Sequence, residues 1–138
     1  MFDKLDKYKN KGHFFFQKGD ALREVSKGIP NLPGVYCIYC LCGGKVDLVY
    51  IGKSGTMLSN GKFKDQLLNK RLNNKQDGMY RQQFFEQKLV EDGNDALDIY
   101  WYVTFDKDNQ DIPSYVEGIL LQRYFEIHRR LPEWNKEY

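Results

Sequence analysis

The chain has 138 residues, of which 41% are hydrophobic, 15% aromatic and 29% charged. This length and composition predict one globular domain with a core of its own, and they exclude a disordered chain. The formal net charge of +2 excludes a polybasic coat, so any binding of nucleic acid must depend on where individual charges lie.

Residues 1–28 are predicted to be an N-terminal extension, and residues 29–138 the main domain. Within the extension, residues 19–28 can form a short helix, which Pro30 and Pro33 keep from continuing. The first twenty residues lack the apolar core of a signal peptide, and no apolar run approaches the ~20 residues that span a membrane. We therefore expect a soluble, cytoplasmic protein that does not bind a membrane.

The segments 35–41 and 48–51 predict a β-hairpin. Both are rich in β-branched and aromatic residues, and Gly43-Gly44 lies between them. Tyr36 and Tyr50 share a face of this hairpin if their positions have the same parity, and a direct pairing of the two centres the turn on Gly43. Ordinary cross-strand packing of the two rings is one explanation for this pair of tyrosines.

The rest of the chain predicts helices and one further strand. The leucines at 67, 68 and 72 have helical spacing and predict a helix over residues 62–73. Residues 79–91 predict a second helix, residues 97–105 a strand, and Ser114 the N-cap of a long helix that ends near Arg130. This order predicts an α+β domain with a central sheet of roughly three strands, the hairpin plus one, flanked by helices.

Two charged residues fall beside the apolar faces of the predicted helices. Glu117 has leucines three and four positions after it, and Arg71 has leucines three and four positions before it. A carboxylate at such a face must be paired, hydrogen-bonded or bound to a metal, because an unpaired buried charge costs several kcal/mol. The residues are explained either by a buried salt bridge between Arg71 and Glu117 or by a half-buried site for a metal and an anion.

Several motifs occur in the order found in one nuclease family. Gly34-Val35-Tyr36 followed by Tyr50-Ile51-Gly52 resembles the signature of the GIY-YIG nucleases, with valine at the middle position of the first motif. The segments "YIGKS", "NKRL", "EGILLQRY" and "LPEWN" are similar to further motifs of the family, and the resemblance covers residues 33–135. The chain departs from the family by the insert "TMLSNGKFKDQ" and by Lys75, where many members have tyrosine or histidine.

The resemblance implies an endonuclease that hydrolyses DNA phosphodiester bonds with a divalent metal. Glu117 would hold one Mg²⁺ or Mn²⁺ ion, and Arg71 would bind a non-bridging phosphate oxygen. Tyr36, hydrogen-bonded with Tyr50, would take the proton from the attacking water, although either tyrosine can be the general base. Lys53 would favour the phenolate by its positive charge.

Further residues follow from the same resemblance. Lys53, Arg71 and Lys75 would contact DNA, and Asn135 would support the site by hydrogen bonding unless it is a simple C-terminal cap. The domain is too small for a separate DNA-reading module, so recognition would come from the N-terminal lysines, the insert, the shape of the DNA, a partner protein or an oligomer. Two alternatives remain: a catalytically weak or inactive nucleic-acid-binding domain of this type, and a purely structural domain with a bridge between Arg71 and Glu117.

Overall fold

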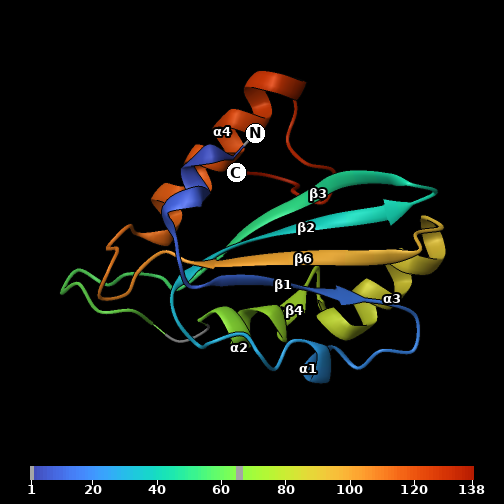
Figure 1. Cartoon of the computed structure of the whole chain (residues 1–138), viewed down its shortest axis with the longest axis horizontal. Helices are drawn as coiled ribbons and strands as arrows, with labels where there is room; N and C mark the ends of the chain where they lie inside the picture. The colour runs from blue at the N-terminus through green and yellow to red at the C-terminus, as the bar shows by residue number, and fades with distance from the viewer. Residues whose placement is uncertain (1, 65–66) are drawn as a thin grey trace.

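A computed structural model describes residues 2–64 and 67–138, which form an α+β fold (Figure 1). The main sheet is antiparallel, with the strand order β1-β6-β2-β3. Its strands are β1 (Lys11–Phe16), β2 (Gly34–Cys42), β3 (Lys45–Ser54) and β6 (Ala96–Val103). The predicted α+β class is therefore confirmed, whereas the sheet has four strands and not roughly three.

The additional strand, β1, comes from the segment that was predicted to be an N-terminal extension. It pairs with β6 along its whole length, from Lys11 opposite Tyr102 to Phe16 opposite Leu97. The Phe16 side chain is fully buried in the core, where its ring meets that of Phe85. Because the partner strand lies more than eighty residues away in the chain, no local pattern in residues 11–16 shows that they complete a sheet.

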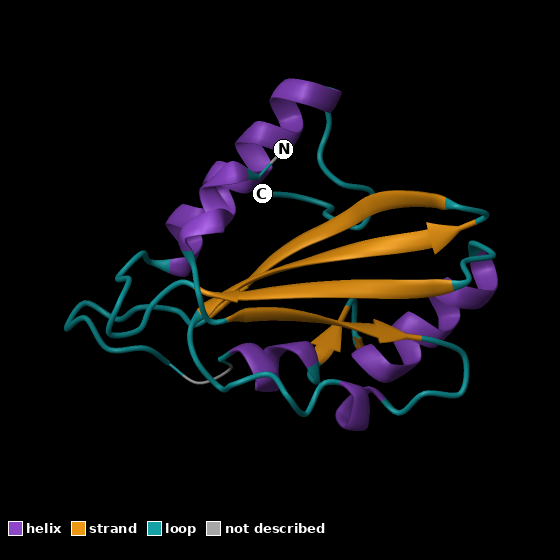
Figure 2. Ribbon diagram, in the orientation of Figure 1, coloured by secondary structure: helices purple, strands orange, loops and turns teal. Residues whose placement is uncertain are grey.

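Helices cover both faces of the sheet (Figure 2). One face carries α1 (Leu22–Val25), α2 (Leu68–Leu72) and α3 (Arg81–Glu91), and the other carries α4 (Pro113–His128) with the 3₁₀ helix η1 (Asp3–Lys7) beside it. Two short strands, β4 (Lys75–Gln76) and β5 (Met79–Tyr80), pair between α2 and α3. In residues 2–64 and 67–138, no helix combines the length and the apolar character that crossing a membrane requires.

The alternation of side chains along β2 divides the core into two clusters. Tyr36 and Ile38 pack toward α2 and α3, in a cluster that also contains Phe85. Val35 and Cys37 pack toward α4 and the N-terminal segment. The central strand is thus buried on both faces, as its nearly continuous apolar sequence requires.

The predicted helix over residues 62–73 is only partly present, because α2 begins at Leu68. Residues before it turn back on themselves, with a β-bridge between Met57 and Phe63, and residues 65 and 66 lie outside the described residues. Pairing of β4 with β5 delays the start of α3 to Arg81.

The long C-terminal helix differs from the prediction at both ends. Ile112 occupies the N-cap position and Pro113 is the first helical residue, so Ser114 lies inside the helix rather than at its cap. Proline suits this first position because it has no backbone N–H to leave unpaired. The helix ends at His128, where Arg129 adopts a left-handed conformation with φ of 58°.

Candidate functional site

The register of the hairpin differs from the direct pairing of the two tyrosines. Tyr36 lies opposite Gly52, and Tyr50 lies opposite Ile38. The turn has positive φ at Gly43 and Gly44, and an irregularity between Ile38 and Tyr39 shifts the pairing beyond it. Tyr50 is thus paired two residues further along β2 than Tyr36. Because side chains alternate between faces, this even offset leaves both tyrosines on the same face, and their ring centroids lie 6.0 Å apart.

Steric contacts explain why glycine occupies one position in each of the two motifs. A Cβ atom at Gly52 would lie 2.5 Å from Cζ of Tyr36 and 2.7 Å from Cε2 of Tyr50, because both rings cross this residue. A Cβ atom at Gly34 would collide with the backbone carbonyl oxygen of Tyr102 on the neighbouring strand. The two glycines therefore permit a close approach of strands and rings that no larger residue allows.

Four of the predicted site residues line one hollow, which has a volume of about 690 Å³. They are Tyr50 and Lys53 from the edge strand β3, Arg71 from α2 and Glu117 from α4. Gly55, Thr56, Phe63 and Lys64 complete the lining. The described lining residues thus carry three basic side chains and one acidic side chain.

Glu117 is a half-buried carboxyl group. Burial raises its pKa above the ordinary value, and the charges of Lys53 and Arg71 oppose that shift. No group of three or more His, Cys, Asp or Glu side chains in the described part of the chain could hold a metal ion by itself. A cation at Glu117 would need further oxygens from phosphate and water, which is the usual way in which Mg²⁺ is bound beside a substrate.

Tyr50 is the phenol that borders the hollow. Burial raises its pKa to about 12, and the neighbouring Tyr36 and Glu117 act in the same direction. The guanidinium groups of Arg81 and Arg71 lower it. Tyr50 is therefore a neutral hydroxyl near pH 7.

Tyr36 is fully buried and does not line the hollow. Its hydroxyl accepts a hydrogen bond of 2.7 Å from Nη2 of Arg81, and not from Tyr50. The guanidinium carbon of Arg81 lies 5.1 Å from the ring centroid of Tyr36 and 5.7 Å from that of Tyr50. The structure thus adds Arg81 to the tyrosine pair.

Arg81 was not among the predicted site residues, although the sequence contains a signal for it. Arg81 has a relative exposure of 0%, and its Nε and Nη1 atoms have no hydrogen-bond partner among the described residues. Phe84 and Phe85 follow it at the third and fourth positions and are buried. This is the same helical spacing that singled out Glu117, and it marks Arg81 as a charge on an apolar face.

Asn135 and Lys75 lie outside the hollow. The Asn135 side chain accepts a hydrogen bond of 3.0 Å from the backbone N–H of Ile51 and donates one of 2.9 Å to the carbonyl oxygen of the same residue. It therefore occupies both free backbone groups of Ile51 on the edge strand, beside Tyr50 and Gly52, and it does not cap α4. Lys75 is exposed, with its Nζ atom 5.1 Å from the ring centroid of Tyr80.

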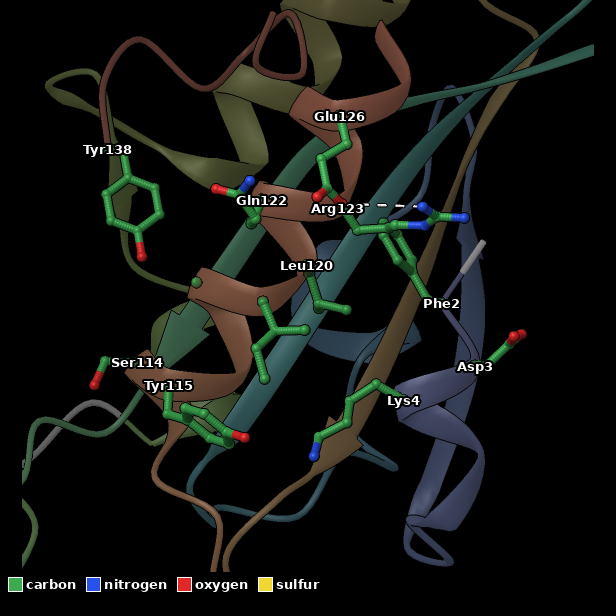
Figure 3. A pocket seen from close by; sticks show the side chains of 12 residues that line it. Phe2, Asp3, Lys4, Ser114, Tyr115, Leu120, Gln122, Arg123, Glu126 and Tyr138 are labelled. Atoms are coloured by element: carbon green, nitrogen blue, oxygen red, sulfur yellow. Dashed lines mark ion pairs between the residues drawn. The ribbon is translucent and has the colours of Figure 1, made fainter. Parts of the chain in front are cut away.

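A second hollow of about 650 Å³ runs along the outer side of α4 (Figure 3). Residues near both chain termini contribute to it, including Phe2 and Tyr138. None of the predicted site residues lines it. Glu117 and this outer groove are therefore separate features of the helix.

The chain was compared with family models, with curated proteins and with solved structures, and none of the three gave a significant match. The resemblance to the GIY-YIG nucleases accordingly depends on the ordered motifs.

Proposed function

We propose that the protein is a divalent-metal-dependent endonuclease that hydrolyses DNA phosphodiester bonds. The observation that carries this proposal is the hollow at the β3 edge, where a half-buried carboxyl group and basic side chains meet beside a phenol. Basic side chains bind phosphate oxygens, and a carboxylate binds a hard divalent cation. These side chains could therefore together bind a phosphodiester group and the metal ion beside it.

Glu117 would hold one Mg²⁺ or Mn²⁺ ion. One carboxylate is sufficient for such a site when substrate phosphate and water supply the other oxygens. When bound, the ion would stabilise the negative charge that develops on the phosphate and on the leaving oxygen. Arg71 would bind a non-bridging phosphate oxygen, for which its planar fork of N–H donors is suited, and Lys53 would add positive charge at the same place.

In the hydrolysis, the water oxygen bonds to phosphorus as the bond from phosphorus to the leaving oxygen breaks, and a proton of the water passes to a base. We assign this base to Tyr50 rather than Tyr36, because Tyr50 borders the hollow and the Tyr36 hydroxyl is buried against Arg81. Only the Tyr50 phenolate can accept this proton, and with a pKa of about 12 its formation at neutral pH, by release of the phenolic proton to bulk water, costs on the order of 7 kcal/mol. Arg81 and Arg71 already act to reduce this cost.

A second candidate function is binding of nucleic acid without efficient cleavage. The raised pKa of Tyr50 favours it, as does the position of Lys75, which does not line the hollow. In this case the same basic residues would hold a phosphate, and the lack of a base active near neutral pH would limit hydrolysis.

The two functions are separated by incubating supercoiled plasmid with the protein and Mg²⁺ and by measuring DNA binding in parallel. We expect nicking that is lost in Glu117→Gln and in Arg71→Ala. Glu126→Gln is the matched control, because Glu126 lies on the same helix, is exposed and pairs with Arg123 at 3.9 Å. Binding without nicking by the unmodified protein would favour the second candidate, and absence of both would contradict the two together.

A further inference from the structure

The insert after β3 has a structure of its own. Met57 and Phe63 form an antiparallel bridge, the backbone N–H of Leu58 donates a 2.7 Å hydrogen bond to the carbonyl of Lys62, and that of Lys64 donates a 2.9 Å bond to Thr56. Residues 55–64 therefore fold back as a small hairpin, which we call the insert hairpin. It is built on the strand that carries Tyr50 and Lys53.

Aromatic packing fixes the insert hairpin to the domain. The Phe63 and Phe105 rings meet edge to face, with centroids 4.9 Å apart and planes at 72°. Gly55 has a φ of +91° and lies close to Phe63, so the hairpin leaves β3 by a turn that only glycine makes without strain. This arrangement brings Thr56 and Lys64 into the lining of the hollow.

A groove of about 360 Å³, distinct from the one on the outer side of α4, continues from the hollow that Glu117 lines. The two share Lys53, Gly55 and Thr56, and the groove then runs between the insert hairpin and the beginning of α4, where Ile112 and Ser114 line it. No acidic side chain lines this groove among the described residues. Among the described residues, the only acid in the combined lining is Glu117, which belongs to the hollow.

We infer that the insert hairpin and the beginning of α4 form a track for the sugar-phosphate backbone of one DNA strand, which passes from the hollow, where Lys64 binds a backbone phosphate, into the groove. A polynucleotide presents phosphates at regular intervals along its backbone, and lysines and hydroxyls bind them without reading the bases. Among the described residues, Lys53 lies where the hollow and the groove join, hydroxyls of Thr56, Ser59 and Ser114 line the groove, and no acid does, which matches such a strand. The inference rests on the proposed function and extends it to the path of the substrate.

Fluorescence anisotropy of a labelled single-stranded oligonucleotide in EDTA, which prevents cleavage, tests this track. Three variants each change the net charge by −1: Lys64→Ala in the hollow, Ser59→Glu in the groove, and Lys62→Ala on the same hairpin but outside both linings. We expect Lys64→Ala to weaken binding about fivefold at ~0.1 M salt and to reduce the salt slope by about 0.7, the value of one phosphate contact to a single strand. We expect Ser59→Glu to weaken it about fivefold, since a nearby like charge costs about 1 kcal/mol in water.

Lys62→Ala should bind within about twofold of the unmodified protein, because Lys62 lines neither the hollow nor the groove and an exposed charge that contacts no phosphate is largely screened. If all three variants weaken binding equally, only net charge matters and the track is wrong. If none weakens it while the unmodified protein binds DNA and nicks plasmid, the track fails and the proposed function stands. If the unmodified protein nicks plasmid but does not bind the oligonucleotide, the track is wrong and the proposed function stands, whereas absence of both binding and nicking refutes both.

Discussion

Replacing Tyr36 by phenylalanine tests whether the tyrosine pair is organised around a buried cation. The substitution removes one hydroxyl and keeps the ring. That hydroxyl is the hydrogen-bond acceptor that the structure gives to Arg81, whose other two guanidinium nitrogens have no partner among the described residues. The change therefore leaves a fully buried guanidinium without a hydrogen bond in the described structure, which is a different perturbation from the loss of a surface hydroxyl.

The magnitude follows from what the guanidinium loses. A hydrogen bond to a charged group contributes about 1.5–3 kcal/mol, and a buried ion left unpaired keeps its full desolvation cost. The cation–π contacts at 5.1 and 5.7 Å remain, because both rings remain. We therefore expect Tyr36→Phe to lower the free energy of unfolding by about 2–3 kcal/mol. In an Arg81→Met background the same substitution should cost less than about 0.5 kcal/mol, since no cation is left to satisfy.

Urea unfolding of the four proteins in this double-mutant cycle gives the coupling energy directly, and we expect about 2 kcal/mol. Tyr124→Phe is the matched control, because Tyr124 is 4% exposed and its hydroxyl has no hydrogen bond among the described residues. Its loss should change stability by less than about 0.5 kcal/mol. A coupling energy near zero would refute the dependence of Arg81 on Tyr36, and so would a loss equal to that of the control.

Three further predictions concern the support of the site. Gly52→Ala should lower the free energy of unfolding by about 1–3 kcal/mol through overpacking, whereas Gly28→Ala, with open space around its Cβ position, should not, and urea denaturation compares them. The folded pKa of Glu117 is raised above its ordinary value of 4.5, so the free energy of unfolding falls as the pH rises from the ordinary pKa to the raised one. Glu117→Gln removes this titration and should therefore raise the melting temperature more at about pH 7 than at about pH 4. An equal gain at the two pH values would contradict this. Asn135→Ala should cost about 1–3 kcal/mol and speed amide exchange at Ile51, and unchanged exchange would show that the amide clamp is unimportant.

Local patterns were sufficient for part of this structure. The paired glycines of the turn, the strand propensity around them and the helical spacing of Glu117 and Arg71 are all features of residues close in sequence. They predicted the hairpin and identified charged groups that line the hollow. Arg81 obeys the same spacing rule, but it lies at the first residue of its helix and has no counterpart in the motifs of the resemblance.

Features that depend on distant parts of the chain could not be predicted in this way. The edge strand β1 exists because β6 is available to pair with it. The hairpin register depends on an irregularity beside Ile38, which no turn residue signals. The insert hairpin depends on Phe105, whose ring fixes Phe63 from another loop. In each case the sequence contains the residues, and only the fold brings them into contact.

The charges of the hollow bear on the choice between the proposed binding site and a structural bridge. A structural ion pair between Arg71 and Glu117 would require only one cationic side chain beside the carboxylate. Buried ion pairs also contribute little net stability. Among the described residues, Lys53 and Lys64 line the same hollow, so two lysines stand against one carboxylate there without Arg71 being counted. Like charges gathered around a partly buried space repel one another and oppose folding. A bound anion removes that repulsion, so the excess of positive charge favours a phosphate ligand over a purely structural role.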